Sequence, residues 1–227
     1  MQRIIRSFLF MITMLTTASA YEHVILSGGP ALTRFENYRV PNDRHDRWWA
    51  NFIRAATLHM DILRSQYGET ETITWYVYKN GYDLRGREDG KPYTSWIAEQ
   101  AAKRGAKLVW ISSGSQFISN MNALPAGRTK TLHYFGHSNK HCFLLDYSSQ
   151  ILGASAAWLH ENELSSLSRR PFSKNAICKS WGCYTGESMS KYWRQATGLK
   201  LIGAKGKTDY EALSFGRMPD INGRWTY

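Results

Sequence analysis

Apolar residues gather along this chain in short runs, separated by stretches in which they recur at helical spacing. Runs rich in β-branched and aromatic residues, bounded by Gly, Ser or Asn, are typical of buried strands. Six such strands are expected, over residues 22–29, 72–79, 106–112, 131–138, 176–183 and 199–204. The run CFLLDY at 142–147 predicts a further short antiparallel strand at the surface.

Four segments between the strands predict helices. The first has an N-cap at Asn42-Asp43 and a stop at Gly68. The other three cover residues 94–103, 155–168 and 187–197. Three regions have no clear helical or strand pattern. Residues 80–92 predict a polar loop, 115–129 fit a short helix and a loop through Pro125-Ala126-Gly127, and the tail beyond 205 has no periodicity. Because strands and helices alternate almost throughout, we predict an α/β fold with a mostly parallel sheet of about six strands flanked by helices.

The first twenty residues have the pattern of a secretory signal peptide. Arg3 and Arg6 give it a positive start, an apolar stretch follows over 8–15, and small residues precede Tyr21. The rest, residues 21–227, is long enough for one core and one domain. No later segment is long and apolar enough to span a membrane. We therefore expect an exported protein, either periplasmic or secreted.

The chain is basic, with a formal net charge of +11. Its Lys and Arg residues are scattered, and no nucleic-acid-binding module is visible, so nucleic acid is not an expected partner. A basic exported protein can instead contact anionic cell-envelope polymers.

The chain has three cysteines, Cys142, Cys178 and Cys183, so at least one stays unpaired within a monomer. On one straight strand, Cys178 and Cys183 would point to opposite faces and lie about 16 Å apart. A disulfide tolerates only about 7 Å between Cα atoms. A Cys142–Cys178 pairing stays open, and it would leave Cys183 free.

Polar and glycine residues cluster at the carboxyl ends of the predicted strands, which is where parallel sheets bind ligands. They are Gly28-Gly29, Ser112-Ser113, Gly136-His137-Ser138 and Gly182-Cys183. If the last two strands are neighbours, their ends place an imidazole beside a thiol, the pairing that nucleophilic catalysis by cysteine needs.

The segment GCYTGES around Cys183 resembles the small-Cys-x-Ser/Thr-Gly turn of the caspase, legumain and gingipain clan of cysteine peptidases. His137 lies 46 residues upstream (183 − 137), close to the roughly 50 typical of caspases. The resemblance implies a caspase-like fold over residues 22–205. Two departures stand out: the glycine precedes the histidine, as Gly136, and Ser138 follows it.

The resemblance also implies roles. Cys183 would be the nucleophile, His137 would protonate the leaving amine, and the backbone N–H groups of Ser138 and Cys183 would bind the oxyanion. Gly136 and Gly182 flank these residues. Asp209 would suit a basic substrate side chain, although a surface ion pair explains it equally well. A peptide or protein substrate is expected, with no metal and no cofactor.

Two other catalytic interpretations use the same segment. Gly136-His137-Ser138 resembles a serine nucleophile elbow, but Lys140 stands where that motif has glycine. The spacing of His133, His137 and His141 by four would form a metal face on a helix; on a strand each step spans about 13 Å, too far for shared ligation.

The aromatic content allows one alternative, a non-catalytic exported protein of the same fold that binds a cell-surface polymer or glycan. Trp75 and Trp110 fall within apolar strands and Trp49 lies on a helix core face, so these three are expected to pack inside. Trp48 and Trp96 remain open as stacking platforms.

Overall fold

The computed structural model describes residues 20–38, 40–41, 48–147 and 156–226. Residues 1–19 of the expected signal peptide, and the expected N-cap at Asn42-Asp43, lie outside the described residues. None of the described helices is both long and apolar enough to cross a membrane.

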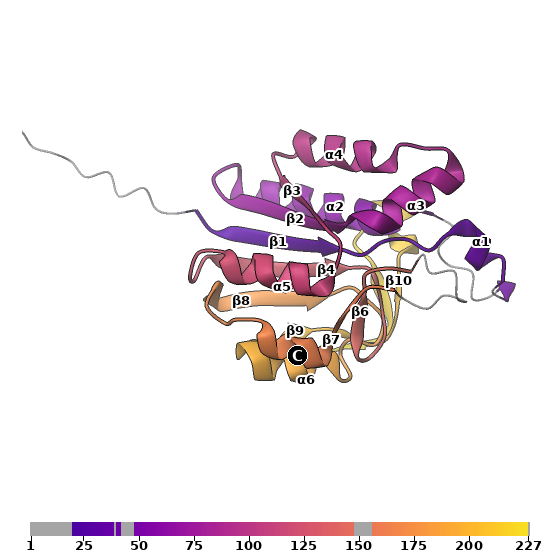
Figure 1. Cartoon of the computed structure of the whole chain (residues 1–227). Helices are drawn as coiled ribbons and strands as arrows, with labels where there is room; N and C mark the ends of the chain where they lie inside the picture. Colours follow the sequence, from indigo (N-terminus) through magenta and orange to yellow (C-terminus); the bar gives the residue numbers. More distant parts are fainter. Residues whose placement is uncertain (1–19, 39, 42–47, 148–155, 227) are drawn as a thin grey trace, which may run out of the picture.

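A sheet of six strands, all parallel, forms the centre of the protein (Figure 1). The order across it is β3-β2-β1-β4-β8-β9. The bounds are β1 Glu22–Ser27, β2 Thr72–Tyr78, β3 Lys107–Ile111, β4 Thr129–Phe135, β8 Phe172–Ser180 and β9 Leu201–Ile202. This α/β architecture confirms the predicted fold class and is consistent with a caspase-like layout. The strand order reverses between β1 and β4, and such a switch point opens a crevice at the carboxyl edge of the sheet.

Helices cover both faces of the sheet (Figure 1). On one face lie α2 Asn51–Tyr67, α3 Lys79–Asp89, α4 Tyr93–Lys103 and the 3-10 helix η3 Glu211–Phe215. On the other lie α5 Gly114–Ala123, α6 Met189–Thr197 and the 3-10 helix η2 Glu161–Ser166. A short helix, α1 Thr33–Glu36, follows β1. Along β1, Val24 and Leu26 join one core while Ile25 joins the other, and all three are fully buried. Side chains that alternate between two buried faces explain why this strand is apolar without a break.

Two small antiparallel sheets lie beyond the carboxyl edge. One is built from β5 His137–Ser138, β6 Cys142–Leu144 and β7 Trp158–His160. The other is a hairpin of β10 Ala204–Asp209 and β11 Asp220–Trp225. The first confirms the antiparallel strand expected around Cys142. The hairpin lies in the tail that the sequence pattern left without regular structure.

Several predicted elements were wrong in kind or extent. Residues 80–92, expected to be a loop, lie mostly in α3, which buries Tyr82 against the core. Its Gly81 packs directly on Gly29, since a Cβ there would lie 2.9 Å from the Gly29 Cα. Within the helix expected over 155–168, the described residues form β7 and the short η2 instead. The first expected helix, α2, starts only at Asn51. The short helix and loop predicted over 115–129 are confirmed by α5, which ends at Ala123, and by the loop that follows it.

The cysteine geometry also differs from expectation. Strand β8 ends at Ser180, so Cys183 lies three residues beyond it and does not share a straight strand with Cys178. All three cysteines are free thiols, so the open Cys142–Cys178 pairing is not made.

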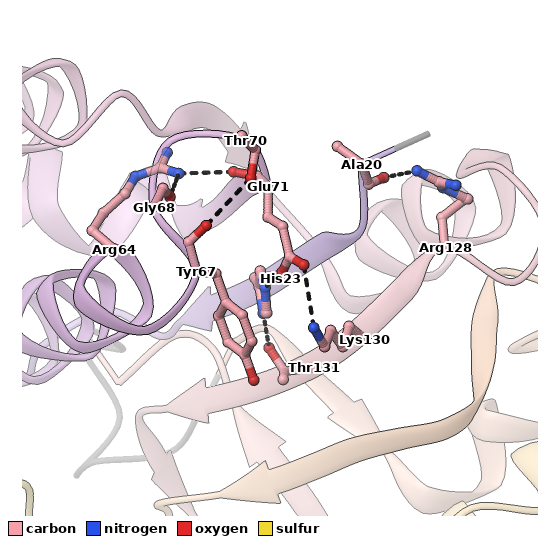
Figure 2. A network of polar contacts seen from close by, with 10 residues as sticks. All are labelled: Ala20, His23, Arg64, Tyr67, Gly68, Thr70, Glu71, Arg128, Lys130 and Thr131. Carbon is pink, nitrogen blue, oxygen red and sulfur yellow. Dashed lines mark hydrogen bonds and ion pairs between the residues drawn. The ribbon is translucent and has the colours of Figure 1, made fainter. Parts of the chain in front are cut away.

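A polar network closes the amino-terminal edge of the sheet (Figure 2). His23 of β1 bonds Glu71 through Nε2 and Thr131 Oγ1 through Nδ1, the latter at 2.8 Å. Lys130 Nζ pairs with the other Glu71 oxygen at 3.2 Å. Burial lowers the pKa of His23, although Glu71 opposes that shift. A neutral His23 that donates to an ionised Glu71 satisfies both groups and links β1, β4 and the segment before β2.

A second histidine cluster lies inside the core, between α2 and the sheet. The rings of His59 and His133 stack with centroids 3.8 Å apart, and Trp181 Nε1 donates to His133 Nδ1 at 3.2 Å. Burial lowers the pKa of His59 from 6.5 to about 3 and holds the pKa of His133 well below its usual range. Both imidazoles are therefore neutral in the folded protein at neutral pH.

These buried imidazoles predict acid-sensitive stability. The folded-state pKa is depressed below the unfolded value, so their contribution is complete above about pH 6.5 and is lost as the pH falls toward 3. From pH 7 to pH 5, His59 alone should remove about 2 kcal/mol of unfolding free energy. Replacing His59→Phe keeps a stacking ring without the titration. Urea unfolding should then show a pH dependence shallower by about that amount, and an unchanged dependence would contradict the prediction.

Candidate functional site

A cavity of about 650 Å³ opens at the carboxyl edge of the sheet, and both His137 and Cys183 line it. Its walls come from the start of α2 and from the end of β10 with the residues that follow. Besides the two candidate catalytic residues, the lining includes Trp48, Asn51, Phe52, Arg54, Gly136, Thr208, Asp209, Tyr210, Glu211 and Ser214. The structure thus brings the sequence-predicted His137, Cys183, Gly136 and Asp209 into one cavity.

Aromatic rings fix the His137 imidazole. His137 follows β4 by one glycine, which carries its side chain to the sheet edge. Its ring stacks on Tyr147 with centroids 4.2 Å apart and meets the Phe52 ring edge-on at 4.9 Å. Rings on two sides restrict the rotamers of the imidazole and orient it within the cavity.

Cys183 lies in the tight turn between β8 and α6. The backbone N–H of Thr208 donates to its sulfur at 3.3 Å, and the Thr208 hydroxyl lies at the same distance. A donated N–H stabilises negative charge on sulfur, the form in which cysteine is a nucleophile. Tyr184 adopts φ 61°, and it is the only non-glycine residue with positive φ among the described residues. Backbone strain of this kind often occurs where a reactive side chain is held at a turn.

Ser138 and Gly182 join the two loops that carry the histidine and the cysteine. Ser138 Oγ donates to the Cys183 carbonyl at 2.7 Å. A Cβ on Gly182 would lie only 2.2 Å from that hydroxyl and 3.2 Å from the Gly136 carbonyl. Position 182 must therefore lack a side chain, and the Ser138 hydroxyl faces the Cys183 loop instead of crowding the cavity.

A buried tyrosine supports the turn at Gly136. Tyr134 hydroxyl donates to the His137 carbonyl at 2.5 Å and to the Leu144 carbonyl at 3.2 Å. The ring passes so close that a Cβ on Gly136 would lie 2.3 Å from the hydroxyl. The glycine before the histidine thus has a packing role, the local reason for the departure seen in the sequence.

The Ser138 amide is directed away from the antiparallel ladder. Asn139 N–H bonds the Cys142 carbonyl at 3.1 Å, which makes residues 139 and 142 a hydrogen-bonded pair. In an antiparallel ladder such pairs alternate with non-bonded ones, and Ser138 pairs with Phe143 at the next position. Its N–H therefore points away from β6.

The end of β10 and the residue that follows it supply two functional residues that the sequence alone missed, Thr208 and Tyr210. Thr208 contacts the sulfur, and Tyr210 hydroxyl donates to the Trp181 carbonyl at 3.0 Å, one residue before the glycine of the Cys183 turn. Burial raises the pKa of Tyr210 well above its usual range, so this donor keeps its proton. Asp209 is exposed and accepts the Glu211 N–H at 2.8 Å. In this stretch the sequence indicated Lys207 and Asp209 as possible pocket residues, and of these two Asp209 lines the cavity.

The alternative assignments do not assemble around this cavity. His133 stacks on His59 in the core, whereas His141 bonds Glu161 at 2.9 Å. Among the described residues, no three His, Cys, Asp or Glu side chains lie close enough to hold a metal ion. The hydroxyl of Ser138, the serine of the elbow interpretation, is engaged by a carbonyl.

Comparison with protein-family models finds none that matches this chain, and a search of curated proteins finds no match either. The functional argument therefore depends on the geometry of the cavity.

The Gly182–Ser138 contact predicts a specific double-mutant result. Gly182→Ala should lower the unfolding free energy by about 1–3 kcal/mol, because the new methyl group collides with Ser138. Ser138→Gly in the same chain removes the collision and should restore part of the loss. Strictly additive losses in urea unfolding would show that the two loops do not meet as described.

Proposed function

We propose that this protein is an exported cysteine-dependent hydrolase, a peptidase with a His137–Cys183 dyad. The observation that carries the proposal is the single cavity lined by both residues, in which a backbone N–H donates to the sulfur. The short motif around Cys183 and the α/β architecture add support.

In the proposed reaction the Cys183 thiolate attacks the scissile carbonyl, and the carbonyl π electrons move onto oxygen. The backbone N–H groups of Ser138 and Cys183 are proposed to bind that oxyanion. His137 then protonates the leaving amine as the C–N bond breaks, which leaves a thioester on Cys183. Water, deprotonated by His137, attacks the thioester, the C–S bond breaks to release the acid, and the Cys183 thiolate is regenerated beside a protonated His137.

The acidic rim of the cavity suggests the substrate side chain. Asp209, the last residue of β10, and Glu211, the first residue of η3, both line it. Arg54, which also lines the cavity, is held by a hydrogen bond to the Leu213 carbonyl at 3.0 Å. A Lys or Arg side chain next to the scissile bond would complement the two carboxylates.

Export is part of the proposal. The expected signal peptide ends before Tyr21, and a peptide or protein in the periplasm or outside the cell would be the substrate. The basic surface is compatible with contact to anionic envelope polymers.

Selective thiol chemistry tests the dyad. Burial raises the pKa of Cys142 to about 11 and that of Cys178 to about 12, so both stay protonated near pH 7. Iodoacetamide should therefore label Cys183 first and abolish peptide hydrolysis in proportion to labelling, as mass spectrometry and a fluorogenic peptide assay would show.

Cys183→Ala should reduce the rate at least about a thousandfold and His137→Ala about 10²–10⁴-fold. Cys142→Ala is the matched control and should keep full activity; its inactivation would contradict the assignment.

The acidic rim predicts a preference that can be reversed. Asp209→Asn should lower kcat/KM about tenfold for peptides with Lys or Arg before the cleaved bond, with little change for an uncharged side chain. Asn keeps an oxygen to accept the Glu211 N–H. Asp220→Asn is the control, because Asp220 pairs with Asp209 across the hairpin but does not line the cavity. Equal losses in the two variants, or a loss that ignores the substrate side chain, would count against this subsite.

A second candidate function has one specific observation in its favour. The Trp48 side chain is 65% exposed and lines the same cavity, an arrangement that suits stacking on a sugar ring. Trp75 is fully buried, as expected. A non-catalytic glycan or polymer binder should lose affinity with Trp48→Ala and keep it after Cys183 is alkylated. A peptidase should show the opposite dependence on Cys183.

A further inference from the structure

A second cavity, of about 500 Å³, lies between α6, the start of β9, the start of β10 and the residues after β11. Thr226, the residue after β11, is part of the lining of this cavity. Gly186 is also in the lining, three residues after Cys183. The cavity is thus distinct from the one that His137 and Cys183 line.

Four basic side chains line this second cavity: Lys191, Arg194, Lys200 and Lys205. They come from three elements that are separate in the sequence, the helix α6, the segment before β9 and the strand β10. Glu187 is the one carboxylate in the lining, so the cavity keeps a formal surplus of three positive charges (4 − 1). Such a surplus within one cavity attracts anions.

Among the residues that the structure describes, none of these four cations has a carboxylate within ion-pair distance. The Lys and Arg residues that do have one lie elsewhere, as in the Lys79–Asp83, Arg104–Asp61 and Lys130–Glu71 pairs. Lys191 Nζ lies 6.0 Å from the centroid of the Tyr192 ring. All four side chains are exposed, and like charges in one cavity without counterions repel one another.

The neighbouring hairpin adds to this unbalanced charge. Lys205 of β10 and Arg224 of β11 are direct cross-strand partners and both are exposed. Direct cross-strand partners project from the same face of a hairpin, and two like charges there are destabilising. A bound anion with several charges would remove the repulsion both in the cavity and across the hairpin.

We infer that this cavity is a binding site for a ligand with closely spaced phosphate groups. Arg194 offers a bidentate fork for phosphate oxygens, and the three lysines supply point charges around it. Three surplus charges in a space of this volume match a di- or triphosphate better than a single carboxylate. The phosphates could belong to a soluble molecule or to a lipid headgroup. This inference does not depend on the proposed hydrolase activity.

Calorimetric titration of the mature chain with inorganic tripolyphosphate at about 150 mM salt tests the inference. The pocket variant carries Lys191→Gln, Arg194→Gln, Lys200→Gln and Lys205→Gln. The control variant carries Lys91→Gln, Lys103→Gln, Lys107→Gln and Lys174→Gln, which are exposed cations on other parts of the surface. Both variants lose four charges, so they separate a defined site from overall charge.

The pocket variant should bind tripolyphosphate at least about tenfold more weakly than the control variant, with both folded by circular dichroism. Affinities within about threefold of each other would overturn the inference and assign the binding to net charge. Vesicles of phosphatidylcholine with phosphatidic acid form the second arm. Binding to vesicles without binding to tripolyphosphate would also overturn it, because it would indicate adsorption to a charged surface and not recognition of closely spaced phosphates.

Discussion

The contact between the loops after β4 and β8 is the constraint on which the candidate site depends. The Ser138 hydroxyl donates to the Cys183 carbonyl at 2.7 Å, and the missing side chain at Gly182 lets the two loops approach this closely. Since β4 and β8 are parallel neighbours, their carboxyl ends already meet at one edge. The contact between the two loops holds them in fixed positions relative to each other, and His137 and Cys183 then line one cavity.

The rest of the fold supports this edge. Two apolar cores hold the sheet from both faces, so the strands that deliver the loops cannot shift independently. Tyr134, below the site, bonds the carbonyl of His137, and Tyr210 bonds the carbonyl of Trp181. A tyrosine hydroxyl thus holds the backbone on each side of the cavity. Tyr134 does so at His137, and Tyr210 does so two residues before Cys183. At the opposite, amino-terminal edge of the sheet, His23 and Lys130 both pair with Glu71, so the Glu71 carboxylate is not left unpaired next to the core.

Sequence patterns predicted a parallel sheet of six strands and the place of the two central residues at its edge. Strands β1 and β2 are apolar runs because both faces are buried, whereas β8 has exposed Lys174 and Asn175 and begins and ends before the predicted 176–183. The carboxyl-end rule pointed to Gly136-His137-Ser138 and Gly182-Cys183. The patterns failed where tertiary contacts decide. Helix α3 contains two glycines and many charges, and it forms because Tyr82 is buried and Gly81 packs on Gly29. The contribution of Thr208 arises from the hairpin β10–β11, whose strand pairing has no alternating apolar signal.

The measurement that tests the central claim most directly separates acylation from leaving-group protonation. An activated ester, whose leaving group needs no proton, is added to the His137→Ala variant. Intact-mass spectrometry then detects an added acyl group, and peptide mapping identifies the residue that carries it. The account predicts an acyl group on Cys183, while amide substrates remain uncleaved by the same variant. A folded His137→Ala chain that stays unmodified at Cys183, or that cleaves amides as fast as the parent, would contradict a dyad in this cavity.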